Sequence, residues 1–148
     1  MKQFSFLICA FLVISKCFGS TITYGERQPD GDGSVVISGE LKHWHNVILT
    51  LDGPFAHERD EDPNPFIHRQ MDVIFTHESG SPHYRVPAYF AADGHAGESS
   101  AESGCKWRAH LSPDKTGQWT YRIEFADTDY DGLLGEFTVV DSDKSGRD

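Results

Sequence analysis

The sequence predicts an all-β protein: an immunoglobulin-like antiparallel β-sandwich of about seven strands that follows an N-terminal signal peptide. Three observations predict this fold. Apolar and polar residues alternate with a period of two through most of residues 34–140, as they do in strands with one buried face. Turn-forming residues such as Ser112-Pro113-Asp114 separate the alternating segments at short intervals. Beyond residues 1–19, no segment carries a convincing apolar stripe at the helical period.

The alternation also predicts which side chains form the core. Trp107 and Trp119 share the apolar face of their strands, so both indole rings are expected to be buried. Pro87 has no backbone N–H to donate, which places its strand at a sheet edge or ends it. Asp52-Gly53-Pro54 is expected to close a strand, and residues 91–103 are expected to hold a short helical turn.

Residues 1–19 have the layout of a cleavable secretory signal peptide. Lys2 supplies a positive charge, residues 4–14 are almost entirely apolar, and Gly19 provides a small residue at the expected cleavage point. The apolar run is shorter than the roughly 20 residues that span a bilayer. We therefore expect the protein to be secreted, or periplasmic or extracellular, after signal cleavage.

The rest of the chain divides by composition. Residues 20–33 are polar and rich in turn residues, and are expected to form a flexible arm. Residues 34–140 form the predicted β-sandwich domain, and residues 141–148 are expected to be a linker or a truncated tail. Cys105 is the one cysteine outside the signal peptide, so no intrachain disulfide is expected.

The acidic balance of the chain excludes several classes of partner. The 23 acidic and 13 basic residues give a formal net charge of −10. Cleavage of the signal peptide removes Lys2 and Lys16, which brings the charge to −12. A surface this negative repels phosphate backbones and anionic headgroups, so we expect no nucleic-acid partner and no membrane partner. Acidic polysaccharides are also repelled, unless a local basic patch or a bound cation intervenes.

Several short motifs follow one another in an order that is hard to ascribe to chance. They are Asn64-Pro65-Phe66, Val86-Pro87-Ala88-Tyr89-Phe90, Asp93-Gly94 and Thr116-Gly117-Gln118-Trp119-Thr120-Tyr121. With these motifs the chain resembles the N-terminal immunoglobulin-like β-sandwich domain of unknown function that precedes glycoside hydrolase and apiosidase-like catalytic domains in secreted bacterial enzymes. Two departures from the family pattern are Ala88, where Gly is usual, and the insert at residues 96–104.

The resemblance implies a β-sandwich beside a (β/α)-barrel hydrolase. We therefore expect a non-catalytic accessory module of a secreted carbohydrate-active enzyme, with a polysaccharide or a glycoside hydrolase catalytic domain as its partner. Two alternatives stay open: a purely structural spacer that packs on an adjacent glycoside hydrolase domain, and a small independent glycosidase. An exposed aromatic patch near the C-terminus would favour docking, whereas a groove distant from it would favour sugar binding.

Four residues are candidates for ligand binding. Sugar sites use flat aromatic side chains, and Trp44, Tyr89 and Tyr130 lie off the core face or near expected loops. Glu58, in a charged loop, is the best single candidate for a glycosidase acid, with a solvated charge as the alternative. No pair of carboxylates stands out, so no catalytic residue is assigned and an enzyme is not expected.

Three other features are interpreted structurally. Asn64-Pro65-Phe66 is expected to fix a turn, with Phe66 inserted into the core. Arg108 and Arg122 are expected to point outward, where they either pair with Glu124 or a ligand or stay solvated.

No cofactor is expected, although one segment resembles part of a calcium loop. Asp127, Asp129 and Asp131 copy the first half of that loop. The twelfth position, where the loop needs a bidentate Glu, holds Thr138. An Asp-rich turn is therefore favoured over a calcium site.

Overall fold

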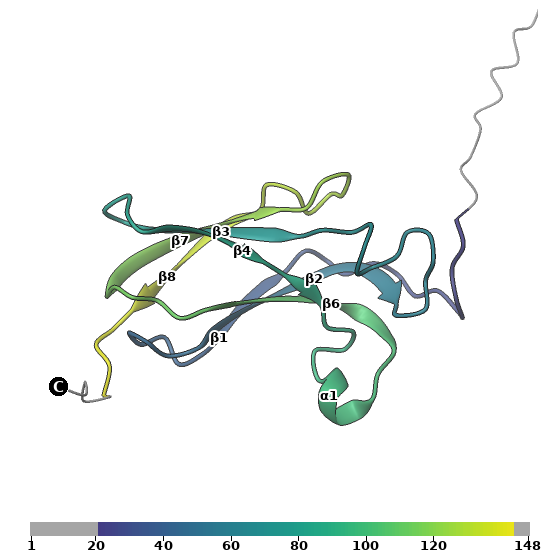
Figure 1. The fold of residues 1–148 in the computed structure, drawn as a ribbon, viewed down its shortest axis with the longest axis horizontal. Coiled ribbons are helices and arrows are strands. Elements are labelled where there is room, and N and C mark those ends of the chain that lie inside the picture. The colour runs from purple at the N-terminus through teal and green to yellow at the C-terminus, as the bar shows by residue number, and fades with distance from the viewer. Residues whose placement is uncertain (1–20, 144–148) are drawn as a thin grey trace, which may run out of the picture.

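The computed structural model describes residues 21–143, which form two four-stranded antiparallel sheets packed face to face (Figure 1). The predicted all-β immunoglobulin-like sandwich is confirmed, with eight strands where about seven were expected. The predicted signal peptide at residues 1–19 lies outside the described residues. The first sheet has the order β1 (Val35–Gly39), β2 (Val47–His57), β6 (Ser103–Leu111), β5 (Tyr89–Phe90), and the second has the order β4 (His83–Pro87), β3 (Asp72–His77), β7 (Gly117–Glu124), β8 (Leu134–Val139).

The core lies between the sheets and contains the two tryptophans that the alternation placed there. Trp107 is 1% exposed and Trp119 is fully buried, which confirms their prediction. The Trp107 ring packs on Phe125, the residue that follows β7 of the opposite sheet, with the ring centroids 4.9 Å apart. Its Nε1–H donates to the Pro54 carbonyl oxygen at 3.1 Å, so the buried polar group of this large side chain has a partner.

Strand β2 does not end at Asp52-Gly53-Pro54, and the prediction that it would is wrong. The strand continues to His57, and its register against β6 shifts between Asp52 and Ala56. A bulge of this kind accommodates a proline, because residues in it make no regular ladder hydrogen bonds. Gly53 lies under the Trp107 ring, where an added Cβ would come within 2.9 Å of Trp107 Cδ1.

The chain changes sheets between β4 and β5. Pro87 ends β4 at the edge of the second sheet, as expected, and the next residue, Ala88, donates its N–H to the Met71 carbonyl oxygen at 2.8 Å. Strand β5 then pairs with β6, with Tyr89 opposite Arg108 and Phe90 opposite Trp107. This register turns Phe90 toward the core and Tyr89 toward solvent.

The segment at residues 21–33 lies against the end of β2. Gly31 and Gly33 donate backbone hydrogen bonds to the carbonyl oxygens of Gly53 and Asp52, at 2.7 and 2.9 Å. These hydrogen bonds hold the segment, which was expected to be a flexible arm, against the sandwich. The helix α1 (Ala96–Ser99) lies in the loop where a helical turn was expected. Among residues 21–143, no helix has the length and apolarity needed to cross a membrane.

Candidate functional site

A groove begins on the outer face of the first sheet and ends beyond its β5 edge. It consists of three adjoining hollows of about 210, 330 and 370 Å³. The first two hollows share Gly94, His95 and Arg108, and the last two share Tyr89 and Phe90. We call this surface the Tyr89 groove, after the residue at the junction of its two larger parts.

Tyr89 presents an aromatic ring whose orientation is fixed. The side chain is on the outer face and 46% of the residue is exposed. Its hydroxyl donates to His110 Nε2 at 2.9 Å, and the two rings are nearly parallel, with an angle of 10° between their planes. His110 Nδ1 lies 3.2 Å from Asn46 Oδ1, so the tautomer with its proton on Nδ1 satisfies both contacts. The ring is therefore held by a hydrogen bond and by stacking.

Phe66 is at the far end of the groove, and the prediction that it inserts into the core is wrong. The residue is 57% exposed, and its neighbour Ile67 is 67% exposed. The expected turn does form, because Asn64 Oδ1 accepts the backbone N–H groups of both residues at 2.9 and 3.1 Å. The Phe66 ring meets Phe90 edge-on, with centroids 6.1 Å apart, and adds an apolar border to the groove.

Arg108 and Arg69 bring positive charge to the groove. Arg108 points outward as predicted and donates from Nε to Thr50 Oγ1 at 3.2 Å. Arg69 is partly buried and lines the hollow beside Phe66. On the other sheet, Arg122 forms an ion pair with Glu124 at 2.7 Å, which is one of the pairings expected from the outward direction of Arg122.

Trp44 is exposed but lies outside the groove. It belongs to the connection between β1 and β2, has a positive φ of 63° and is 57% exposed. Its N–H donates to the Pro113 carbonyl oxygen at 2.9 Å, and its ring lies 4.8 Å from the His43 ring. His43 in turn donates its N–H to Val140, so this aromatic side chain lies beside the residues that follow β8.

Glu58 is exposed, whereas Asp60, two residues later, is buried and makes structural hydrogen bonds. Asp60 is 2% exposed and accepts the N–H groups of Tyr24 and His57, at 2.8 and 2.9 Å, together with the Arg27 guanidinium at 2.8 Å. Burial opposes its ionisation, but the hydrogen bonds outweigh that effect and hold the pKa of Asp60 below its usual value. The carboxylate has its acceptor positions filled and fastens the segment at residues 21–33 to the sandwich.

Tyr130 and the Asp-rich turn lie between β7 and β8. The Tyr130 hydroxyl donates to the Gly31 carbonyl oxygen at 2.6 Å, and burial raises the pKa of this phenol. Asp131 Oδ1 accepts the N–H of Phe125 at 2.8 Å, while Asp127 and Asp129 are exposed. Within the described chain, these three carboxylates do not gather into a group of potential metal ligands.

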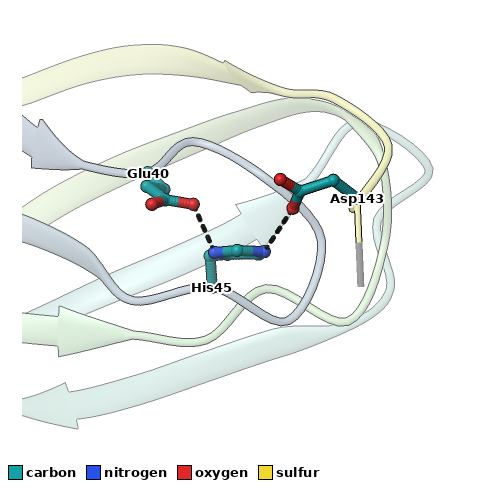
Figure 2. A group of neighbouring side chains, drawn as sticks. All are labelled: Glu40, His45 and Asp143. Carbon is teal, nitrogen blue, oxygen red and sulfur yellow. Dashed lines mark ion pairs between the residues drawn. The ribbon is translucent and has the colours of Figure 1, made fainter. Parts of the chain in front are cut away.

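The group of potential ligands that does gather among residues 21–143 consists of Glu40, His45 and Asp143. Figure 2 shows the imidazole between the two carboxylates, with Nδ1 2.5 Å from Glu40 Oε2 and Nε2 3.2 Å from Asp143 Oδ1. The two ring nitrogens point in different directions, so one ion cannot bind both. Lys42 Nζ lies 3.2 Å from Asp143 Oδ2, and its hydrogen bond holds the pKa of Asp143 low. We interpret this group as an ion-pair cluster that joins the β1–β2 connection to the residues after β8.

A wider hollow of about 510 Å³ covers the outer face of the second sheet. Ile74, Thr120 and Leu134 line much of it. Its lining presents no exposed Phe, Tyr or Trp, because Tyr121 is 8% exposed. The Tyr89 groove is therefore the better candidate for a binding site.

The fold is an antiparallel β-sandwich module with an open groove on its first sheet. The chain belongs to the family described as domain of unknown function DUF5060, which matches residues 40–126. This match confirms membership of a family of unknown function; a position ahead of a catalytic domain stays a prediction.

Comparison with solved and curated proteins adds little to this assignment. Among solved structures, the chain is similar to a putative glycoside hydrolase from Bacteroides vulgatus ATCC 8482, with 18% identity and a TM-score of 0.49. The similarity covers 70% of this chain and 16% of that chain, so this chain spans a small part of its length. No curated protein matches the sequence.

Proposed function

We propose that this domain is a non-catalytic module that binds polysaccharide through the Tyr89 groove and accompanies an exported carbohydrate-active enzyme. The observation that carries the proposal is the Tyr89 ring, which is 46% exposed, held by His110, and placed where two hollows meet. A sugar ring has an apolar C–H face that packs on an aromatic ring. A ring that is already fixed loses little conformational entropy on binding.

Two features of the groove support a polymer as the ligand. The three hollows are open and adjoin one another, which suits a chain of sugar units better than one small molecule. Three of the four motifs that carry the family resemblance also contribute to the groove, since Phe66, residues 87–90 and Gly94 line it, whereas the fourth motif lies at β7 of the other sheet. Export is part of the proposal and rests on the signal peptide predicted at residues 1–19.

Affinity electrophoresis in gels that contain plant or algal polysaccharides tests this function. Covering roughly 80 Å² of the Tyr89 ring is worth about 2 kcal/mol, so Tyr89→Ala is expected to weaken binding about thirtyfold. The matched control is Trp44→Ala, which removes an exposed aromatic ring outside the groove and is expected to leave retardation unchanged. Absence of retardation by every polysaccharide in the panel would refute polysaccharide binding.

A second candidate function is docking on a glycoside hydrolase catalytic domain, and the position of Trp44 favours it. This exposed ring lies beside residues 140–143, as an aromatic contact with an adjacent domain would require. In Figure 1 the end of β8 lies away from α1, which borders the Tyr89 groove. The two functions therefore use different surfaces, and Trp44→Ala and Tyr89→Ala separate them: docking would be lost in the first variant and glycan binding in the second.

A further inference from the structure

The arginines of the described chain differ in what they contact. Among residues 21–143, four arginines form an ion pair with a carboxylate: Arg27 with Asp60, Arg59 with Glu102, Arg85 with Asp72 and Glu124, and Arg122 with Glu124. The remaining two, Arg69 and Arg108, have no carboxylate within ion-pair distance in that part of the chain. Both line the Tyr89 groove.

This distribution is unexpected in a chain with 23 acidic and 13 basic residues. With acidic groups in such excess, an outward-facing arginine readily finds a carboxylate partner, as the other four do. A partly buried guanidinium without a carboxylate keeps several donors for a ligand. The groove therefore has cationic donors that the fold itself does not neutralise.

Arg108 is also positioned for a ligand. The bond from its Nε to Thr50 Oγ1 fixes the side chain and leaves the two terminal nitrogens with no hydrogen-bond partner among residues 21–143. One of these, Nη2, would lie 3.3 Å from a Cβ at position 94, so the glycine there leaves room beside it. Two parallel N–H groups match the two oxygens of a planar carboxylate.

The carboxylates that line the groove are mostly engaged by the protein. Asp72 pairs with Arg85 at 2.7 Å, and Asp52 pairs with Lys106 at 2.7 Å. Asp93 accepts the Ser99 hydroxyl and the His95 N–H, and these bonds hold its pKa low. Glu98 has no ion pair among the described residues. Three of the four acidic groups are thus turned to the protein, while both arginines are open to the groove.

We infer that the Tyr89 groove recognises an acidic polysaccharide, with Arg108 binding the carboxylate of a uronic acid unit that lies next to the sugar stacked on Tyr89. The inference rests on the proposed polysaccharide-binding function and names its substrate class. Arg69, in the hollow beyond Phe90, binds a further carboxylate along the chain. The two free nitrogens of Arg108 match the two oxygens of a planar uronate carboxylate in a bidentate contact. The net negative charge of the protein acts at long range and is screened over about 8 Å at physiological salt, so direct contacts decide binding.

Isothermal titration with matched polymers tests the inference. The probes are polygalacturonate, alginate and glucuronoxylan, each beside its carboxyl-reduced counterpart, together with a sulfated galactan that contains no uronate. Binding to at least one uronate polymer is expected to be at least about tenfold tighter than to its reduced form. Arg108→Gln is expected to lose about tenfold on the uronate polymer and less than about twofold on the reduced form. Arg122→Gln is the control, and is expected to change neither.

The outcomes separate this inference from the proposed function. Equal binding to uronate and reduced polymers, abolished by Tyr89→Ala, would overturn the uronate specificity and leave polysaccharide binding intact. Preference for the sulfated galactan would overturn it as well. No binding to any polymer would refute both. Circular dichroism and melting curves of Arg108→Gln confirm that a loss of affinity does not come from unfolding.

Discussion

Asp60→Asn is expected to destabilise the domain by about 3 kcal/mol. Asp60 is 2% exposed and accepts two backbone N–H groups and the Arg27 guanidinium. The asparagine has nearly the same size, so no cavity forms, but its amide group must face donors. Breaking a buried pair costs about 3–5 kcal/mol, and the lower end applies because the Arg27 side chain is 37% exposed and regains water. For a domain of this size, the melting temperature should fall by about 10 °C.

Urea unfolding followed by tryptophan fluorescence measures the effect, since Trp107 and Trp119 are buried and report on the core. Glu58→Gln provides a control two residues away at an exposed position, with an expected change within about 0.5 kcal/mol. If Asp60→Asn shifts the urea midpoint no more than Glu58→Gln does, the role assigned to the buried carboxylate is wrong.

The pH dependence of the same variant gives an independent check. The folded-state pKa of Asp60 lies below its unfolded value of about 3.9. Its contribution is therefore fully present above the unfolded pKa and is lost as the pH falls through the folded pKa. The difference in stability between the wild-type protein and Asp60→Asn should shrink as the pH falls below about 4. A difference that stays constant down to pH 2 would contradict this.

Two further substitutions test contacts around β7 and β8. Gly135→Ala is expected to cost about 1–3 kcal/mol in urea unfolding, because a Cβ there would overlap both the hydroxyl and the ring edge of Tyr121. Equal or greater stability of Gly135→Ala would refute the close approach. Tyr130→Phe removes the hydrogen bond to Gly31 and should cost about 1 kcal/mol without changing polysaccharide affinity. Lost affinity at unchanged stability would instead make Tyr130 a ligand contact.

The period-two pattern predicted the core because each inward side chain needs only its own strand to define its direction. The burial of Trp107 and Trp119 could be predicted from their positions in the apolar-polar alternation alone. The continuation of β2 through Gly53-Pro54 could not be predicted in this way, because the same two residues are equally suited to a turn. The bulge exists because this segment packs against Trp107 on β6, more than fifty residues later, and no local signal reports that contact.

Side chains in loops were predicted less well, for a similar physical reason. The turn at Asn64 was predictable because its side chain bonds to its own neighbours, but the exposure of Phe66 depends on where Phe90 lies. Asp60 could not be distinguished from Glu58, because its partners Tyr24 and Arg27 are 36 and 33 residues away. The outward direction of Arg108 was predictable, whereas its lack of a carboxylate neighbour depends on the register of β6 against β2.

The Tyr89 groove depends on β5, a strand of only two residues, which links the core directly to the groove. Phe90 packs against Trp107 with ring centroids 5.3 Å apart, and Tyr89 stacks on His110 from the opposite face. Because adjacent residues of a strand face opposite ways, the burial of Phe90 fixes the direction of Tyr89. A slip of one residue would bury the phenol and expose the phenyl ring, and is therefore opposed by the whole apolar contact. Hydrogen bonds from Ala88 to Met71 and from Ala91 to Lys106 hold both ends of the strand. The outer face of this edge strand thus stays open to solvent, while the packing of its inner face holds Tyr89 in place.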